Sequence, residues 1–404
     1  MRLLMISVDA LPRLGGISLM AHYLANALAD EGVSVEFLGP LGTHCPTGFP
    51  ARYAVIEDFE SRTKARGGGA AVQEDERIER LLSLIVADRR CDRILLMHPN
   101  YYGPAATDLA ARFGIPVSCF SHGYEVRSQT IPRDDTDLTA LAADADRRDP
   151  GERLLRVLGR ADERLANSTY TADLLRSLNA PPPVRVVGCG IARDVIEREV
   201  AASEPGDPPA RADRRAALGL GAMPMIVSCG RLVPHKRVDR LIDMVAASDE
   251  LQAVVIGDGP ERLALEEHAR ATGAADRVTF AGQVEEDEKW RLHRASDFAA
   301  LLSETNDEQG QVEGFGIALL EGAIAGAVPV SSGTGGMVDV VKDGETGLIL
   351  PPDASAAAAA ARLSEVASRP DAMNALAERA RDQVLHTYNY ERIARDLTNG
   401  WRTA

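Results

Sequence analysis

Two glutamates, Glu313 and Glu321, frame the segment EGFGIALLE, whose residue types suit an anionic ligand. Gly314 and Gly316 let the backbone adopt positive φ and bring its N–H groups against a bulky anion. The run 317–325 predicts a helix whose first turn offers partial positive charge and free N–H donors to a diphosphate. Glu321 would then accept hydrogen bonds from a ribose diol, and Glu313 would face a sugar. A plain loop-to-helix turn fits the same spacing, so the segment alone leaves both interpretations open.

Two cations, Arg231 and Lys236, lie in the segment GRLVPHKRVDRLI, which directly follows the apolar run MIVSC. The run predicts a strand, so both side chains would lie at its carboxyl end, where ligands bind in open α/β sheets. Arginine offers a bidentate fork and lysine a mobile point charge, which together suit the two phosphates of a nucleoside diphosphate. Taken alone, two such cations are more often solvated surface residues.

Further motifs follow in the second half of the chain in a fixed order. The strand-like run AVVI leads into GDGPE from Gly257 to Glu261, VTFAGQV follows at 278–284, and GTGGMVDVVKDGETGLIL comes after EGFGIALLE. With this series the sequence resembles the retaining glycosyltransferases of family 4, which have the GT-B fold, an α/β fold of two facing Rossmann-like domains. The resemblance spans most of the chain, and its ordered motifs are specific.

The resemblance implies roles for individual residues. The catalytic set would be His122, Arg231, Lys236 and Glu313. The donor would contact Gly15, Gly16, Gly230, Gly257, Gly282, Val284, Gly314, Phe315, Gly316, Ile317 and Glu321. Arg231, Lys236 and the helix dipole near Gly316 would stabilise the departing diphosphate, and the backbone near Gly282 and Val284 would hold the base. We expect no metal, because no Asp-x-Asp run is placed to hold one against the diphosphate, and no cofactor.

The first half of the chain predicts another doubly wound parallel sheet, because the strand-like runs LLMISV, VSVEFL, ILLM and PVSCF alternate with helical patterns. Gly15 and Gly16 open a helix after the first run, where the family's glycine loop approaches the donor phosphates or the acceptor. A Gly-Gly pair alone is weak and fits an ordinary helix start. His122 follows PVSCF, in register with a family histidine that contacts the donor sugar; a purely structural histidine is the alternative.

The chain length predicts two domains, because 404 residues exceed what one hydrophobic core usually supports. We predict an N-terminal Rossmann-like, acceptor-binding domain over 1–200 and a Pro- and Gly-rich linker over 201–215. A Rossmann-like, nucleotide-sugar-binding domain would occupy 216–384. The amphipathic segment 385–404 predicts a helix that returns to the first domain. With the carboxyl edges of the two sheets facing, His122 and the Gly15 loop would lie across the cleft from Glu313.

Two stretches of the first half predict loops. The triplet from Gly67 to Gly69 lies between basic and acidic residues, and the stretch 132–150 is dense in Asp and Arg. The first would be a solvated linker or a loop that folds over an acceptor. The role of the second, an insertion relative to the family pattern, is open.

Charge, cysteines and hydropathy exclude several classes of protein. A net charge of −15 and a pI near 5.1 argue against an extended nucleic-acid surface. The five cysteines are an odd set without C-x-x-C spacing, which indicates free thiols in a reducing compartment. No apolar segment approaches the roughly 20 residues that span a bilayer, and the opening LLMISV does not have the features of a signal peptide. We therefore expect a cytoplasmic protein, of undetermined oligomeric state, without nucleic-acid partners or integral membrane segments.

The reaction implied by the resemblance is transfer of a sugar from a nucleoside diphosphate to an acceptor hydroxyl, with retention of configuration. Family frequency puts UDP-sugars first as donors. The acceptor would be a soluble small molecule such as a cyclitol or secondary metabolite, because residues 1–190 carry no sustained basic amphipathic helix. A membrane lipid or polysaccharide acceptor, a nucleotide-sugar epimerase or hydrolase, and a catalytically silent binder are the alternatives.

Overall fold

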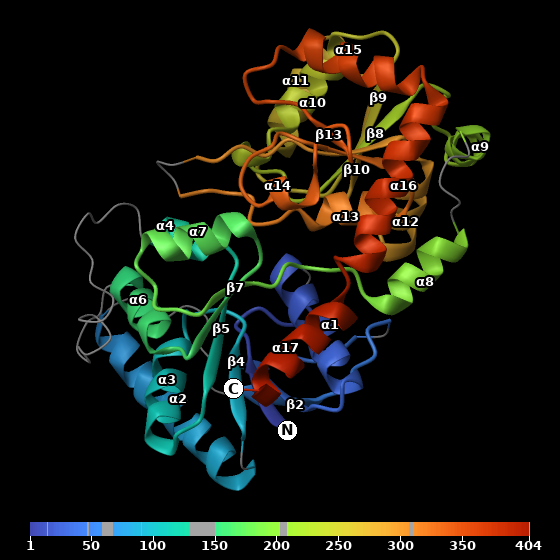
Figure 1. Ribbon diagram of the computed structural model, residues 1–404. Helices are drawn as coiled ribbons and strands as arrows, with labels where there is room; N and C mark the ends of the chain where they lie inside the picture. Colours follow the sequence, from blue (N-terminus) through green and yellow to red (C-terminus); the bar gives the residue numbers. More distant parts are fainter. Residues whose placement is uncertain are drawn as a thin grey trace. The chain divides into compact units, whose positions relative to one another are not determined.

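The protein consists of two compact units, each built on its own parallel sheet (Figure 1). The computed structural model describes residues 1–13, 15–46, 48–58, 68–89, 91–129, 150–202, 208–306 and 310–403. Unit 1 holds the described residues of 1–189 and 390–403 together with Gly310, and unit 2 holds those of 190–306 and 311–389. Two Rossmann-like α/β units are the architecture that the sequence predicts.

Unit 1 has a seven-stranded parallel sheet in the order β3-β2-β1-β4-β5-β6-β7. Its strands are β1 (Arg2–Ile6), β2 (Ser34–Pro40), β3 (Ala54–Asp58), β4 (Arg93–Leu96), β5 (Val117–Ser121), β6 (Glu163–Ala166) and β7 (Val184–Val186). Its helices are α1 (Gly16–Asp30), α2 (Gly68–Arg89), α3 (Gly103–Phe113), α4 (Tyr124–Gln129), α6 (Pro150–Arg160), α7 (Thr169–Ser177) and α17 (Tyr390–Thr403). The central strands β1, β4 and β5 are buried along almost their whole length, as expected for parallel strands that helices cover on both faces.

The C-terminal helix α17 belongs to unit 1, as predicted. The rings of Tyr23 on α1 and Tyr390 on α17 stack with their centroids 5.9 Å apart. The indole Nε1 of Trp401 donates to the Glu163 carboxylate at 3.0 Å, and the Arg93 guanidinium lies over the same indole ring. These contacts bury the apolar face of the helix against the unit's sheet.

Unit 2 has a six-stranded parallel sheet in the order β10-β9-β8-β11-β12-β13. Its strands are β8 (Met225–Cys229), β9 (Gln252–Ile256), β10 (Val278–Gly282), β11 (Phe298–Leu301), β12 (Val328–Ser331) and β13 (Leu348–Ile349). Its helices are α8 (Arg193–Ala202), α9 (Pro208–Ala217), the 3₁₀ turn η1 (Pro234–Lys236), α10 (Val238–Ala246), α11 (Arg262–Ala271), α12 (Glu286–Ala295), α13 (Ile317–Ile324), α14 (Met337–Val340), α15 (Ala356–Ala367) and α16 (Pro370–His386). Alternation along β8 points Ile226 into one core cluster and Val227 into another on the opposite face.

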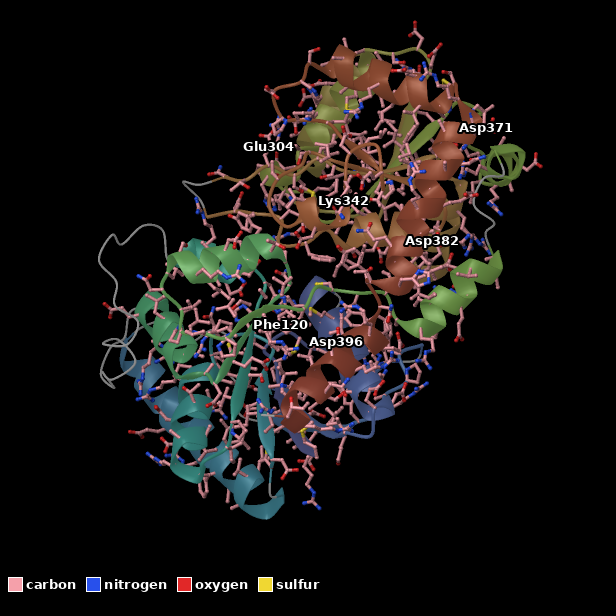
Figure 2. The ribbon with its side chains drawn as sticks, viewed as in Figure 1. Phe120, Glu304, Lys342, Asp371, Asp382 and Asp396 are labelled. Atoms are coloured by element: carbon pink, nitrogen blue, oxygen red, sulfur yellow. The ribbon has the colours of Figure 1, made fainter. Side chains whose placement is uncertain are left out.

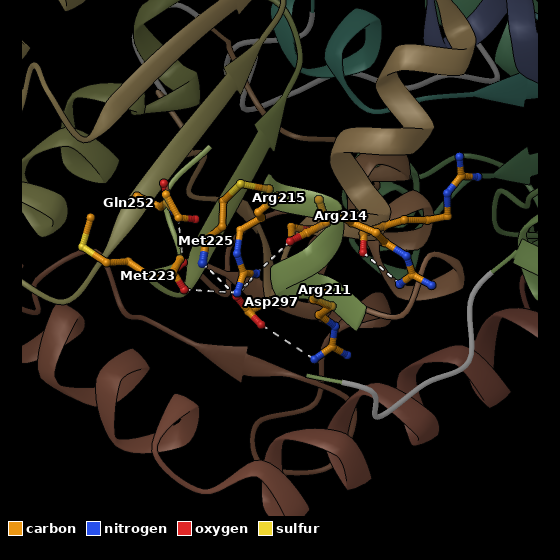
Figure 3. Close-up of polar contacts among 12 residues, drawn as sticks. Arg211, Arg214, Arg215, Met223, Met225, Gln252 and Asp297 are labelled. Atoms are coloured by element: carbon orange, nitrogen blue, oxygen red, sulfur yellow. Dashed lines mark hydrogen bonds and ion pairs between the residues drawn. The ribbon is translucent and has the colours of Figure 1, made fainter. Parts of the chain in front are cut away.

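Part of the predicted linker is helix α9, and charged side chains fix that helix to unit 2 (Figure 3). Arg211 and Arg215, one helical turn apart, are both buried. Arg215 Nη1 donates to the Asp297 carboxylate at 2.8 Å, and Arg211 lies 3.7 Å from its other oxygen. The same carboxylate accepts the Met225 N–H at 2.8 Å. The proline and arginine content of this stretch is typical of a solvated linker. In the structure, however, two of its arginines attach a packed helix to unit 2.

The structure also tests predictions about the loops, the C-terminal helix, the cysteines and membrane-spanning segments. Gly68 and Gly69 open helix α2 and are not loop residues, whereas Gly67 and the stretch 132–149 lie outside the described residues. The predicted C-terminal helix 385–404 begins only at Tyr390, because α16 continues to His386. All five cysteines are free thiols; Cys119 and Cys189 are buried and the other three are half-buried. In the parts of the chain that the structure describes, no helix has both the length and the apolarity needed to cross a membrane.

Candidate functional site

The carboxyl edge of the unit 2 sheet brings Lys236 and Glu313 together, 77 positions apart in sequence. Lys236 ends the 3₁₀ turn after β8, and Glu313 lies in the loop before α13. The Lys236 ammonium donates to Glu313 Oε2, and the Ser303 hydroxyl, two residues beyond β11, donates to the same oxygen at 3.4 Å. Parallel strands that end at one edge account for this convergence of distant segments. Figure 2 shows Glu304, the residue after Ser303, in this part of unit 2.

The Glu313 carboxylate is ionised although its surroundings are dry. Burial by itself would raise its pKa, but the Lys236 ammonium and the Phe315 N–H hold the pKa below the usual value. Burial, and next the Lys236 charge, lower the pKa of His235, so its imidazole is neutral at pH 7. The edge therefore carries one fixed anion beside one fixed cation, an arrangement that can orient sugar hydroxyls and stabilise a phosphate.

The turn between Glu313 and α13 exposes the helix N-terminus. Gly316 has φ 101°, in the left-handed region that glycine adopts readily, whereas Gly314 lies outside that region, contrary to the prediction. Phe315 is buried and packs edge-on against Tyr388 at 5.4 Å, which fixes the turn. No side chain caps α13, so the N–H groups near Ile317 remain available to an anion.

Glu321 lies one turn into α13, as predicted, and has a partner that sequence reasoning missed. Lys289, on α12, donates to Glu321 Oε1 at 2.7 Å and to Glu286 at 2.9 Å. Burial alone would lower the pKa of Lys289, but the two carboxylates raise it above the usual value, so it stays charged. Lys289 therefore fixes the orientation of the Glu321 carboxylate. The surrounding sequence, DEKW, indicates only the charged start of a helix and gives no sign of the contact with Glu321.

Three of the predicted donor-binding glycines pack against neighbouring segments of backbone. The Gly257 N–H donates to the Gly282 carbonyl at 2.7 Å, and a Cβ built on Gly257 would lie 2.0 Å from the Gly230 oxygen. Glycine at 257 is thus required by close approach of two loops, whatever binds there. Val284 is partly buried against the core cluster of β8 and β9. The Arg231 side chain is exposed and makes no hydrogen bond or ion pair with the described residues, whereas its backbone carbonyl accepts from the Val233 N–H at 3.1 Å.

In unit 1 the predicted glycine loop lies after β1 and starts helix α1. Gly15 is the N-cap, with extended backbone at φ −176°, and Gly16 is the first helical residue. A Cβ at Gly15 would meet only Ser18 Oγ, at 3.8 Å, so packing does not demand glycine there. No side chain caps α1. The small residue leaves this helix start open to an approaching ligand.

His122 directly follows β5 and is largely buried, with 8% of its surface exposed. Its Nε2 lies 2.7 Å from the Met97 carbonyl, which only accepts, so Nε2 carries the proton of this hydrogen bond. Its ring stacks on that of Phe120 with the centroids 5.1 Å apart, and it lies 6.4 Å from the ring of His98. Figure 2 labels Phe120 in unit 1. His98, in the loop after β4, was missed, although its position after ILLM is the same signal that marks His122.

Models of two protein families match the chain, one in each half. The family described as "Glycosyl transferase 4-like domain" matches residues 15–190, and "Glycosyl transferases group 1" matches residues 211–383. A GDP-mannose-dependent alpha-(1-6)-phosphatidylinositol monomannoside mannosyltransferase of Mycobacterium tuberculosis is 27% identical over 367 residues, which cover 86% of this chain and 85% of the relative. A D-inositol 3-phosphate glycosyltransferase of Rhodococcus jostii is 31% identical over 327 residues, with 76% and 66% covered.

Solved structures share the fold. Sucrose-phosphate synthase from Thermosynechococcus elongatus matches with a TM-score of 0.77 at 21% identity, over 100% of this chain and 98% of that one. Anabaena Alr3699/HepE in complex with UDP and glucose matches with a TM-score of 0.70 at 16% identity, over 100% of both chains. At these identities the similarity concerns the arrangement of the backbone.

Proposed function

Because the chain belongs to family 4 of the glycosyltransferases, which have the GT-B fold, we propose that it transfers a sugar with retention of configuration from a nucleoside diphosphate sugar to an acceptor hydroxyl. The observation that carries the proposal is the geometry of unit 2. There Lys236 and Glu313 form an ion pair beside the uncapped N-terminus of α13, and Glu321 lies one turn further along that helix. A cation and a helix N-terminus suit a diphosphate, and the carboxylates suit hydroxyl groups.

Each charged residue has a part in this proposal. Lys236, Arg231 and the α13 N-terminus stabilise the charge that grows on the leaving diphosphate. Glu313, held ionised, accepts hydrogen bonds from the sugar hydroxyls, and Glu321 accepts from the ribose diol. The backbone near Gly282 and Val284 holds the base. None of these steps uses a metal ion, so EDTA is expected to leave the rate undiminished.

The donor and the acceptor are proposed from the names of the relatives. GDP-mannose stands first, ahead of the UDP-sugar that family frequency predicts, because the mannosyltransferase relative aligns over most of the chain. The named substrates of both relatives contain an inositol ring, free as a phosphate or in a lipid headgroup. A cyclitol hydroxyl is therefore the proposed acceptor class, carried either by a soluble phosphate, as the sequence predicts, or by a lipid headgroup, the alternative.

A panel of donors and acceptors tests the proposal. Thermal shift with GDP-mannose, UDP-glucose and the free nucleotides identifies the donor, since a ligand that binds the native state raises the melting temperature. Transfer is then measured with inositol phosphate and with phosphatidylinositol in vesicles. Sugar released to water or epimerised, with no product on any acceptor, would favour the hydrolase or epimerase alternative.

We expect Glu321→Ala to weaken binding of the donor and of the free nucleoside diphosphate to the same extent. The lost charge-assisted hydrogen bonds to the ribose are worth about 2 to 4 kcal/mol. Calorimetry with the nucleotide measures the loss, and Glu365→Ala, which removes an exposed carboxylate on α15, is the matched control. Unchanged nucleotide affinity in a folded Glu321→Ala variant would refute the ribose assignment.

We expect His122→Gln to impair transfer more than nucleotide binding. Glutamine can keep a donor to the Met97 carbonyl but offers nothing in the place of Nδ1. A fall in kcat/KM of about tenfold or more is therefore expected if Nδ1 contacts the reacting sugar. The comparison needs both variants, His122→Gln and His122→Ala, with melting temperatures. Activity that tracks only the folded fraction would make His122 a structural residue.

A further inference from the structure

Three potential metal ligands converge beneath the carboxyl edge of unit 2, and the proposed sugar transfer gives a role to only one of them, Glu321. Cys229 ends β8, His293 lies on α12 and Glu321 on α13. The thiol sulfur, an imidazole nitrogen and a carboxylate oxygen lie within 4.8 Å of one another. The three elements are neighbours in the packed unit, so the cluster does not depend on a flexible loop.

His293 is the unusual member of this cluster. It is 1% exposed, and neither of its ring nitrogens has a hydrogen-bond partner. A buried polar group without a partner destabilises a protein, so such groups are rare and call for an explanation. Burial, and next the Lys289 charge, lower the pKa of His293 to about 3. The ring is therefore the neutral imidazole, the form that coordinates metal ions.

The charges around the cluster suit a divalent cation. Lys289 bonds Oε1 of Glu321, and Oε2 makes no hydrogen bond or ion pair with another described residue. Once the Cys229 thiol is ionised, three anions, Cys229, Glu286 and Glu321, surround the single Lys289 cation. The two negative charges in excess match the charge of a divalent ion.

We propose that Cys229, His293 and Glu321 form a binding site for Zn²⁺. Sulfur, imidazole and carboxylate are the ligands that zinc takes, and three protein ligands leave a fourth position for water. Bond lengths of about 2.0 to 2.3 Å place tetrahedral ligand atoms about 3.4 Å apart, so small side-chain rotations close the site. Binding displaces the thiol proton to solvent as the zinc–sulfur bond forms. Burial raises the pKa of Cys229 to about 12, so zinc must displace a proton that is otherwise held.

The site is inhibitory, a consequence that rests on the proposed function. Glu321 cannot coordinate zinc and accept the ribose hydroxyls with the same oxygen, so zinc and the nucleotide compete. Zinc binding itself stands apart from the reaction and is measured without any sugar donor.

Binding is tested on the untagged full-length protein with Zn²⁺ and a chromogenic chelator as competitor. We expect one high-affinity equivalent per chain, and at least a tenfold weaker affinity in Cys229→Ala and in His293→Leu. Cys45→Ala, which removes a thiol beside His22 in unit 1, is the matched control and should bind zinc as the wild type does. Co²⁺ in place of zinc should give a thiolate charge-transfer band in the near-ultraviolet that Cys229→Ala abolishes. Zinc affinity unchanged in both variants, or no such band in the wild type, would overturn the site.

His293→Leu is also expected to fold with undiminished stability, because it replaces an unpartnered polar group by an apolar one. Its transferase activity should equal that of the wild type without zinc and persist at zinc concentrations that inhibit the wild type. Zinc that binds but leaves nucleotide affinity and rate unchanged would overturn the inhibitory consequence. A protein that binds zinc at these residues but transfers no sugar from any donor would contradict the proposed function and leave the metal site intact.

Discussion

Replacing Lys236 by methionine is expected to lower turnover by about a hundredfold or more, with a smaller effect on donor affinity. Charge on the leaving diphosphate grows as the glycosidic bond breaks, so a cation beside it contributes most in the transition state. The structure adds a second effect. Without Lys236, the largest influence that opposes burial is gone, so the pKa of Glu313 rises and the anion that orients the sugar is weakened as well. Steady-state kinetics with the identified donor, and calorimetry with the nucleotide, separate the two parameters.

Two further variants show whether the charge or the fold is responsible. Lys342→Met removes an exposed lysine of unit 2 (Figure 2) and should leave turnover unchanged. The double variant Lys236→Met with Glu313→Gln removes both members of this half-buried pair, so it should recover part of the stability lost in the single variant but no activity. Turnover of Lys236→Met within about fivefold of the wild type would contradict a role in leaving-group stabilisation.

Arg231 separates the transition-state effect from the structural one. It is exposed and bonds none of the described side chains, so Arg231→Ala has no folded-state contact to break. A drop in turnover in this variant would therefore be an effect on the substrate alone. We place Arg231 beside Lys236 in the proposed mechanism, but only Lys236 is shown to touch another site residue.

The part of the site that could be predicted from the sequence is the part that parallel-sheet topology dictates. A polar residue that follows an apolar strand must lie at the sheet's carboxyl edge, and this rule places Lys236, Glu313 and His122 correctly. The same rule would have found His98, which follows β4. The left-handed turn at Gly316 was also predictable, because the helix after it needs a sharp entry.

The other features of the site and the fold depend on tertiary packing, which the local sequence does not reveal. Lys289 looks like one more charge on a solvated helix, and only the fold shows that it bonds Glu321 across two helices. Gly257 matches a donor-binding motif, yet the approach of the Gly230 carbonyl already requires glycine there. Arg215 lies in a Pro-rich stretch typical of linkers, and its burial depends on Asp297, 82 positions away.

Asp297→Ala is expected to destabilise unit 2 by about 3 to 5 kcal/mol, the range for breaking a buried ion pair by removing one partner. The substitution leaves Arg215 and Arg211, which are 5% and 3% exposed, as buried cations without their anion. It also removes the acceptor of the Met225 N–H at the first residue of β8. Urea unfolding followed by Trp290 fluorescence in a Trp401→Phe background reports on unit 2, since the chain has two tryptophans, one in each unit.

The control for this prediction is Asp343→Ala, which breaks the ion pair between Asp343 and Arg362. Both side chains of that pair are more than a third exposed, so solvent screening should limit the loss to about 1 kcal/mol or less. The contrast between the two aspartates distinguishes a buried anchor from a surface pair of the same residue types. Helix α9 is also held by backbone carbonyls of unit 2, which accept from Arg211 and Arg215, so the Asp297 carboxylate is the only charged partner removed by the substitution. Equal losses for the two variants would mean that apolar packing, and not the ion pair, holds α9 in place.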